Sequence, residues 1–90
     1  MIDELLAVLD MPEEEQEEWC RDKTMPYRWR ESLADLAFRL RDEAVVNQGE
    51  VAWHRAVVKV CDYMGKRIVW FKGYAQPIHW VIAALIAKEK

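Results

Sequence analysis

The sequence has few of the residues from which catalytic sites are commonly built. Its 90 residues include one serine (Ser32), one threonine (Thr24), one asparagine (Asn47) and three glycines. The glycines are far apart, so the chain has no glycine-rich loop to bind a phosphate. Ser32 lies in the first turns of an expected helix, which favours a structural role. We therefore expect a protein that is not an enzyme and that has no catalytic residues and no cofactor.

Residues that bind metals are equally sparse. The chain has two cysteines, Cys20 and Cys61, and two histidines, His54 and His79. Chelating pairs on helices are three or four residues apart, or form a C-x-x-C turn, whereas His54 and Cys61 are seven apart. We expect no metal site. Cys61 is expected to be a small buried hydrophobic residue. His79 is expected on the exposed side of a first helical turn, or to donate a hydrogen bond to a carbonyl.

Neither a secretory leader nor a membrane span is indicated. The first residues are acidic, without the basic segment and apolar run of a leader. The uncharged segment Pro77 to Ala87 is shorter than the roughly 20 apolar residues that cross a bilayer. We expect a cytoplasmic protein without a membrane partner. Its two thiols are expected to be reduced and at least half-buried, and nothing in the sequence supports a Cys20–Cys61 disulfide.

The most informative feature that is present is the uncharged segment from Pro77 to Ala87. One face of this expected helix is aliphatic, and alanines occupy the opposite face together with Trp80. A helix that is apolar on every side belongs inside a protein. We expect the rest of the chain to surround it, with Leu85 among the most buried residues. The aliphatic face is formed by Ile78, Val81, Ile82, Leu85 and Ile86.

Hydrophobic residues recur at helical spacing in four earlier segments, approximately 1–9, 12–23, 27–46 and 50–64. Asp10 and Glu13 are expected to form a capping box for the second helix, and Gly49 and Gly65 to end the third and fourth. The pattern predicts a single all-α domain of four to five helices. It comprises an acidic helical region (1–23), a helical core (26–64), an extended segment (66–75) and a C-terminal core helix (77–89).

The third and fourth helices each have one clear apolar face. On the third helix the buried side is expected to contain Trp29, Leu33, Leu36, Ala37, Leu40 and Ala44. On the fourth it is expected to contain Trp53, Ala56, Val57, Val60, Cys61 and Met64. A narrower stripe on the third helix, formed by Ala34, Phe38 and Val45, lies off the main face. This stripe either extends the core or contacts a partner.

The segment from Arg67 to Phe71 differs from the rest because it is rich in β-branched and aromatic residues, which favour a strand. Gly65 and Gly73 bound it, and no second strand is evident in the sequence. A lone strand leaves half of its backbone groups unpaired. Three alternatives follow: an extended loop across the core, a continuation of the fourth helix, or pairing with another copy.

Charge is unevenly distributed along the chain. The net charge is −3, but residues 1–20 hold eight acids and no base, while residues 21–90 hold more bases than acids. The acidic end is expected either to fold over the basic body or to keep the protein in solution. The eight acids are Asp3, Glu4, Asp10, Glu13, Glu14, Glu15, Glu17 and Glu18.

Cations and aromatic rings alternate between residues 66 and 74, and no acid occurs from Gly65 to Ala87. Bases of a single-stranded nucleic acid stack on such rings while cations follow its backbone. The alternative is that the rings close the open end of the helical core. A helix-turn-helix interpretation through Gly49 fits poorly, because Glu50 would face phosphate with the wrong charge. The residues concerned are Lys66, Arg67, Trp70, Phe71, Lys72 and Tyr74.

The segment Gln76 to Glu89, with the sequence QPIHWVIAALIAKE, resembles the C-terminal helix of small uncharacterised proteins encoded in phage and prophage regions. The resemblance covers about a sixth of the chain and brings no catalytic residue with it. It implies a bacterial or viral cytoplasmic setting and a small accessory role.

Taken together, these patterns predict a non-enzymatic interaction protein that associates with itself as a homodimer and also binds an unidentified protein. The alternative is a nucleic-acid-binding module that uses residues 66–74. The dimer hypothesis rests on three apolar surfaces that so small a domain has limited means to cover at once. The candidate contact residues are Phe38, Val45, Arg67, Trp70, Phe71 and Tyr74.

Overall fold

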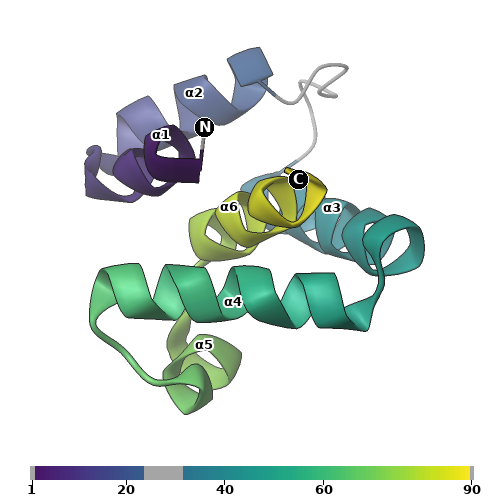
Figure 1. Ribbon diagram of the computed structural model, residues 1–90. Helices are drawn as coiled ribbons and strands as arrows, with labels where there is room; N and C mark the ends of the chain where they lie inside the picture. Colours follow the sequence, from purple (N-terminus) through teal and green to yellow (C-terminus); the bar gives the residue numbers. More distant parts are fainter. Residues whose placement is uncertain (1, 24–31, 90) are drawn as a thin grey trace.

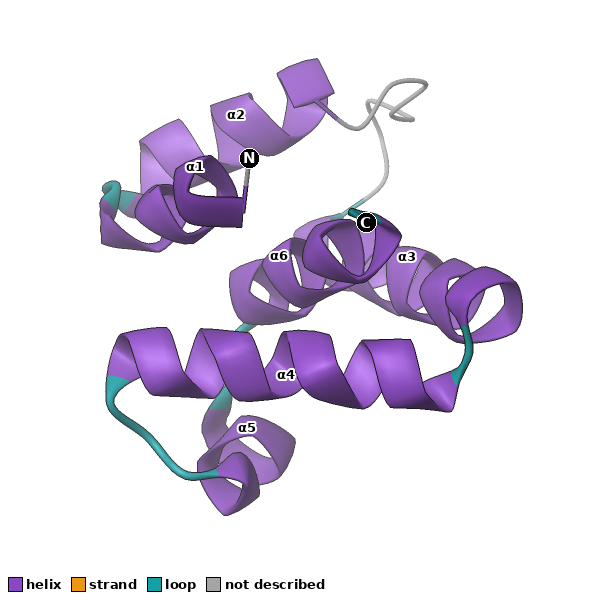
Figure 2. Cartoon of the chain, viewed as in Figure 1, coloured by secondary structure: helices purple, strands orange, loops and turns teal. Residues whose placement is uncertain are grey.

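Helices follow one another along the chain in the computed structural model, which describes residues 2–23 and 32–89. These residues form six α-helices and one short 3₁₀ helix, with no strand (Figures 1 and 2). The all-α class is therefore confirmed, whereas the expected number of four to five helices is too low. The helices are α1 (Ile2–Ala7), η1 (Val8–Asp10), α2 (Glu13–Lys23), α3 (Leu33–Gln48), α4 (Glu50–Met64), α5 (Ile68–Tyr74) and α6 (Pro77–Lys88).

Helix α6 lies at the centre of the fold and contacts α3, α4, α1 and η1 (Figure 1). Its aliphatic and alanine faces are both covered, as expected for a helix that is apolar on every side. The alanines have short side chains and therefore let neighbouring helices approach closely. The buried residues of α6 are Ile78, His79, Val81, Ile82, Ala83, Ala84, Ile86 and Ala87.

Leu85 is only half-buried, so the expectation that it is among the most buried residues is wrong. It lies beside a hollow of about 370 Å³ that Leu5 of α1 and Trp19 of α2 also line. The helices that cover α6 on this side are short, and most of their large apolar side chains are themselves only half-buried. They therefore shield Leu85 less completely than α3 and α4 shield the rest of α6.

Helix α3 begins where a serine can cap it. The Ser32 hydroxyl accepts a hydrogen bond from the Asp35 backbone N–H at 3.1 Å, a common N-cap arrangement. The structural role expected for Ser32 is thus confirmed. The expected start near Tyr27 and the expected burial of Trp29 lie outside the described residues. The buried side of α3 agrees with the sequence pattern and comprises Leu36, Ala37, Leu40 and Ala44.

Two glycines with positive φ set the ends of α4. Gly49, with φ 91° and ψ 161°, is the only residue between α3 and α4, and Gly65, with φ 69° and ψ 32°, lies in the left-handed region after α4. Glycine reaches these angles without the steric penalty that a Cβ imposes. The side of α4 that packs on α6 contains the expected residues. Ala56, Val57, Val60 and Cys61 are buried, and Trp53 and Met64 are half-buried.

Polar contacts hold the N-terminal helices in place. The Gln16 side chain is buried and its Nε2 donates hydrogen bonds to the carbonyl oxygens of Val8 and Leu9, at 3.1 and 3.4 Å. The Tyr63 hydroxyl of α4 donates a hydrogen bond to the Asp10 carboxylate. Asp10 lies in η1, and this hydrogen bond ties η1 to α4. The expected capping box of Asp10 with Glu13 does not form, because α2 begins only at Glu13.

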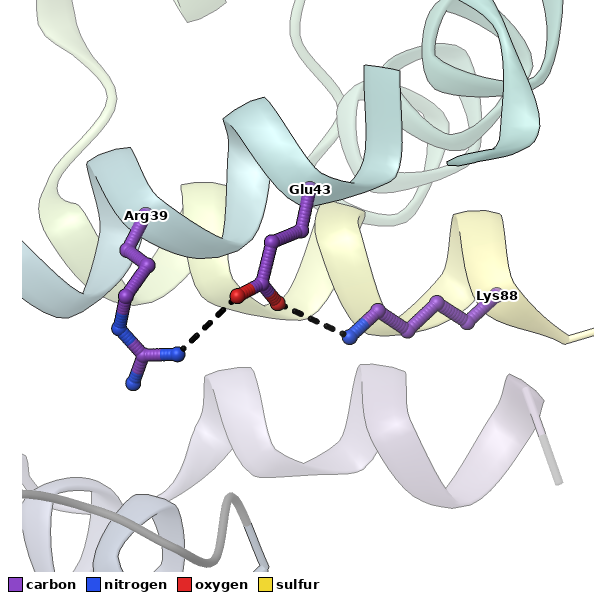
Figure 3. Close-up of polar contacts among 3 residues, drawn as sticks. All are labelled: Arg39, Glu43 and Lys88. Atoms are coloured by element: carbon purple, nitrogen blue, oxygen red, sulfur yellow. Dashed lines mark hydrogen bonds and ion pairs between the residues drawn. The ribbon is translucent and has the colours of Figure 1, made fainter. Parts of the chain in front are cut away.

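An ion-pair cluster joins α3 to the end of α6. Glu43 of α3 lies between Arg39, 3.3 Å from its Oε1, and Lys88, 3.7 Å from its Oε2 (Figure 3). All three side chains are about 40% exposed, so water screens the charges and each pair adds little stability. The cluster fixes the relative position of two helices that apolar packing already holds together.

The acidic helix α2 and helix α5, which follows the basic residues Lys66 and Arg67, lie at opposite ends of the molecule (Figure 1). Helix α2 packs on η1, whereas α5 packs on α4. The acidic N-terminal region therefore does not cover the basic residues of α5 in this structure. The acidic end nevertheless packs on the body of the same chain, because α1 and η1 contact α6.

Candidate interaction surface

The segment expected to be extended is the helix α5, because its tertiary contacts favour helical spacing over strand spacing. Ile68 is half-buried and Phe71, three residues later, is 2% exposed, so both lie on one side of a helix. Alternation in a strand would instead have placed Ile68 and Phe71 on opposite sides. Here packing overrides the strand preference of the sequence, as it often does for short segments.

Three rings from three different helices form an aromatic cluster beneath α5. Trp53 of α4 stacks on Trp80 of α6 with ring centroids 5.7 Å apart. Phe71 of α5 lies 4.8 Å from Trp80 and 6.3 Å from Trp53, at steeper angles. Tilted and offset pairs of this kind are the favourable arrangements of aromatic rings. The cluster extends the core. Of the rings that were expected to close the open end of the core, Phe71 is buried and Trp70 is half-buried, whereas Tyr74 is 76% exposed.

His79 is 8% exposed and connects α5 with the start of α6. Its Nδ1 accepts a hydrogen bond from the Gln76 backbone N–H at 2.9 Å, which satisfies a donor at the start of α6. The Trp70 ring meets the imidazole edge-on at 5.1 Å. Burial lowers the pKa of His79. The expectation that His79 is exposed, or donates to a carbonyl, is wrong.

A hollow of about 930 Å³ opens above the aromatic cluster, between α3, α4 and α5. The rings of Trp53, Phe71 and Trp80 lie along it. Its other side chains come from the end of α3, the start of α4 and the inner side of α5. They are Arg41, Asp42, Val45, Val46, Glu50, His54, Val57, Ile68 and Lys72.

A smaller hollow of about 270 Å³ adjoins the first, because Lys72 and Trp80 line both. Together the two hollows follow α3 from Ala34 to Val46, which spans about 18 Å at 1.5 Å per residue. We call these two hollows the α3–α5 groove. The smaller hollow is mainly apolar and is lined by Ala34, Ala37, Phe38, Lys72, Ala75, Pro77 and Trp80.

Large apolar side chains stand exposed along the α3 wall of this groove. Phe38 is 60% exposed and Val46 is 81% exposed, and both line the groove. The Arg41 guanidinium lies over the Trp80 ring at 5.7 Å and also contacts Asp42 at 3.1 Å. The groove therefore combines an aromatic base, an apolar wall and a small number of charges. This composition is common in surfaces that bind other proteins.

The six candidate contact residues do not form one site. Phe38 and Val45 line the groove, and Phe71 lies at its base but is almost fully buried. Trp70 packs against His79 instead of lining the groove. The two remaining candidates, Arg67 and Tyr74, are exposed but line neither hollow.

Sequence reasoning missed the two tryptophans at the base of the groove. Trp53 and Trp80 were both assigned to helix faces, but only the three-dimensional structure brings them together with Phe71. One signal was present in the sequence, since five tryptophans are many for a 90-residue interior. Lys72 was recognised as a cation but not as a residue that faces α3.

Chemically reactive groups are few in the described part of the chain. Residues 2–23 and 32–89 contain no group of three or more His, Cys, Asp or Glu side chains placed to hold a metal ion. No disulfide joins Cys20 to Cys61, and both cysteines are buried. Burial raises the pKa of the Cys20 thiol to about 12 and also raises that of Cys61, so both thiols stay protonated near neutral pH.

Within the described ranges, each helix is too short or too polar to cross a membrane. Comparison with known proteins finds no matching family model, no matching curated sequence and no matching solved structure.

Proposed function

We propose that the protein is a non-enzymatic interaction module whose contact surface is the α3–α5 groove. The observation that carries this proposal is the exposure of Phe38 and Val46 beside an open aromatic base. Soluble monomers rarely leave large apolar side chains next to an apolar hollow, and such patches commonly mark contact sites. The accessory role and the phage-like setting suggested by the C-terminal helix are part of this proposal. So is a cytoplasmic location, which the two protonated thiols suit.

The proposed partner is a second copy of the chain. A two-fold dimer lets one surface cover its own counterpart. The groove suits this arrangement because its α3 wall carries projecting side chains while its base is hollow. One surface therefore supplies both the inserting groups and the space that receives them. An unidentified second protein remains part of the proposal, with the same groove or another surface as its site.

Sedimentation equilibrium over a range of micromolar concentrations tests this proposal. Wild type is expected to form a dimer, and Phe38→Asp is expected to sediment as a 10.7 kDa monomer. The matched control is Val69→Asp, because Val69 of α5 is 77% exposed but lines neither hollow. A wild type that is monomeric throughout the range contradicts self-association. A dimer that tolerates Phe38→Asp contradicts the groove as its interface.

Trp70→Asp, a substitution that the sequence alone would suggest, is a poor probe of this interface. The Trp70 ring packs on His79 and Phe71, at centroid distances of 5.1 and 6.5 Å. A carboxylate at this position would be placed against the start of α6 and would lower the free energy of unfolding. Loss of the dimer would then follow from loss of the fold.

Nucleic-acid binding is the alternative function. One observation favours it, since Lys66, Arg67, Lys72 and Tyr74 are all exposed on or just before α5. Two of the three rings that would stack on bases are already engaged, because Phe71 is buried and Trp70 packs on His79. Binding to single-stranded DNA that weakens steeply with added salt would support this alternative. Salt-independent or negligible binding at low salt would exclude it.

A further inference from the structure

We propose that the occupant of the groove is helix α3 of a second copy, aligned by Asp35 of one copy against Lys72 of the other. This inference rests on the proposed self-association and adds which helix enters and which charges set its position. Both charged residues are exposed. Within the described ranges 2–23 and 32–89, neither of them has an ion-pair partner within 4.0 Å. Each is therefore available to a group from outside the chain.

Helix α3 has the shape that the groove requires. The groove extends for about 18 Å, equal to about twelve helical residues at 1.5 Å each. Helices that dock in grooves present apolar side chains separated by three, four or seven residues. Ala34, Phe38 and Val45 follow this spacing, and Phe38 is the most prominent because it is 60% exposed.

Charge complementarity selects α3 over the other exposed helices. Lys72 lies in both hollows and is the only charged side chain among the described residues that line the smaller one, so an entering helix should bring an acid to this position. Asp35 precedes Phe38 by three residues, which places the two side chains on neighbouring positions of the α3 surface. Helix α2 is richer in acids, but its apolar residues Trp19 and Cys20 already pack in the core of their own chain.

A two-fold axis makes the contact reciprocal. If α3 of one copy lies in the groove of its partner, symmetry places the partner's α3 in the first copy's groove. Each dimer then contains two Asp35–Lys72 contacts and two Phe38 insertions. Exchange of these charges between the two positions should preserve the contacts, whereas a change at one position alone should replace attraction by repulsion.

The test is a charge exchange followed by sedimentation equilibrium. Asp35→Lys and Lys72→Glu are each expected to raise the dimer dissociation constant at least about fivefold, the equivalent of the two exposed ion pairs that each dimer would lose, both of middle strength. The double variant is expected to return to within about twofold of wild type. Lys66→Glu is the matched control, because Lys66 is exposed but outside the groove, and it should leave the constant unchanged.

Asp35 also lies in the first turn of α3, where a lysine opposes the helix dipole. Asp35→Asn removes the charge without adding a cation, and it should give a smaller loss in the same direction. A double variant that dimerises no better than the weaker single variant overturns this inference. If wild type is a dimer and Phe38→Asp is a monomer in that case, the groove remains the proposed interface, but the Asp35–Lys72 alignment is wrong. A monomeric wild type overturns both.

Discussion

The two sides of α6 that α3 and α4 leave open are treated differently by the rest of the chain. On one side, α1 and η1 contact α6 and leave Leu85 half-buried beside a small hollow. On the other, α5 leaves Trp80 half-buried at the base of an open groove. A helix that is apolar all round needs cover on both sides. The chain itself supplies the cover on one side, and under our proposal a partner copy would supply it on the other.

The covered side is held by apolar packing, with Val8 of η1 fully buried, and by polar groups that tie the short helices together. Helix α1 contains no fully buried residue, and α2 buries only Gln16 and Cys20. Gln16 satisfies two carbonyl oxygens, and Tyr63 bonds to Asp10 across to α4. Hydrogen bonds of this type contribute modestly when made, but a buried carbonyl left unpaired is costly. The N-terminal cover should therefore be easier to loosen than the contacts of α6 with α3 and α4.

The largest expected effect comes from the centre of α6. Ile82 is fully buried, so Ile82→Ala should lower the free energy of unfolding by about 2–5 kcal/mol through lost apolar burial and a residual cavity. Leu85 is only half-buried beneath the N-terminal helices, and Leu85→Ala should cost clearly less. Urea denaturation of both variants measures the difference. Equal losses would show that the N-terminal helices cover Leu85 as completely as Ile82 is covered.

A smaller effect is expected at the N-terminal cover. Gln16→Ala removes both donors from the carbonyls of Val8 and Leu9 and should cost about 1–3 kcal/mol. Glu15→Ala, at an exposed neighbouring position, is the control and should change stability by no more than about 0.5 kcal/mol. If the two variants unfold at the same urea concentration, the buried amide does not hold the cover in place.

Two glycines near α5 test the helical state of the open side. Gly65→Ala forces a Cβ into the left-handed region and should cost about 1 kcal/mol. Gly73 lies inside α5 with a negative φ and no atom close to an added Cβ, so Gly73→Ala should add about 0.5–1 kcal/mol of stability. Thermal unfolding of the two variants decides whether residues 68–74 are helical or extended. A destabilising Gly73→Ala would favour the extended conformation that the sequence alone suggested.

The smallest expected effect is a pH dependence at the junction of α5 and α6. Burial lowers the pKa of His79 below the 6.5 of an exposed histidine, so the unfolded chain binds the proton first as the pH falls. The stability that neutral His79 contributes is complete above about pH 6.5 and is lost progressively below it. Protonated Nδ1 also ceases to accept the Gln76 N–H.

The matched control is His79→Gln, because a glutamine at this third helical position can still accept the N–H of residue 76 but does not titrate. Urea midpoints measured between pH 7.5 and 5 should fall more steeply for wild type than for the variant. Parallel pH profiles would show that His79 is not responsible for the loss.

The sequence predicted the parts of the fold that depend on helical periodicity and helix ends. The buried faces of α3 and α4, the central position of α6 and the breaks at Gly49 and Gly65 follow from local patterns. It did not predict α5, because a run of four β-branched and aromatic residues, 68–71, fits a strand equally well until Phe71 meets Trp53 and Trp80. Local propensity cannot register that contact.

The groove was predicted only in part for the same reason. Phe38 and Val45 stand out as a stripe off the main face of α3, and that stripe does line the groove. The base of the groove needs residues from α4, α5 and α6 to meet, and their separation in the chain gives no local signal. The buried Gln16 was also missed, because a glutamine within an acidic run normally remains in water.

Hydrogen exchange measured by mass spectrometry at two protein concentrations tests the difference between the two sides of α6 most directly. If a partner copy covers the open side, amides of 33–48 and 68–74 should exchange more slowly in the concentrated sample than in the dilute one. Amides of 2–23 should exchange at the same rate in both, because the chain already supplies that cover. Rates that do not depend on concentration anywhere, or slowing confined to 2–23, would contradict the account.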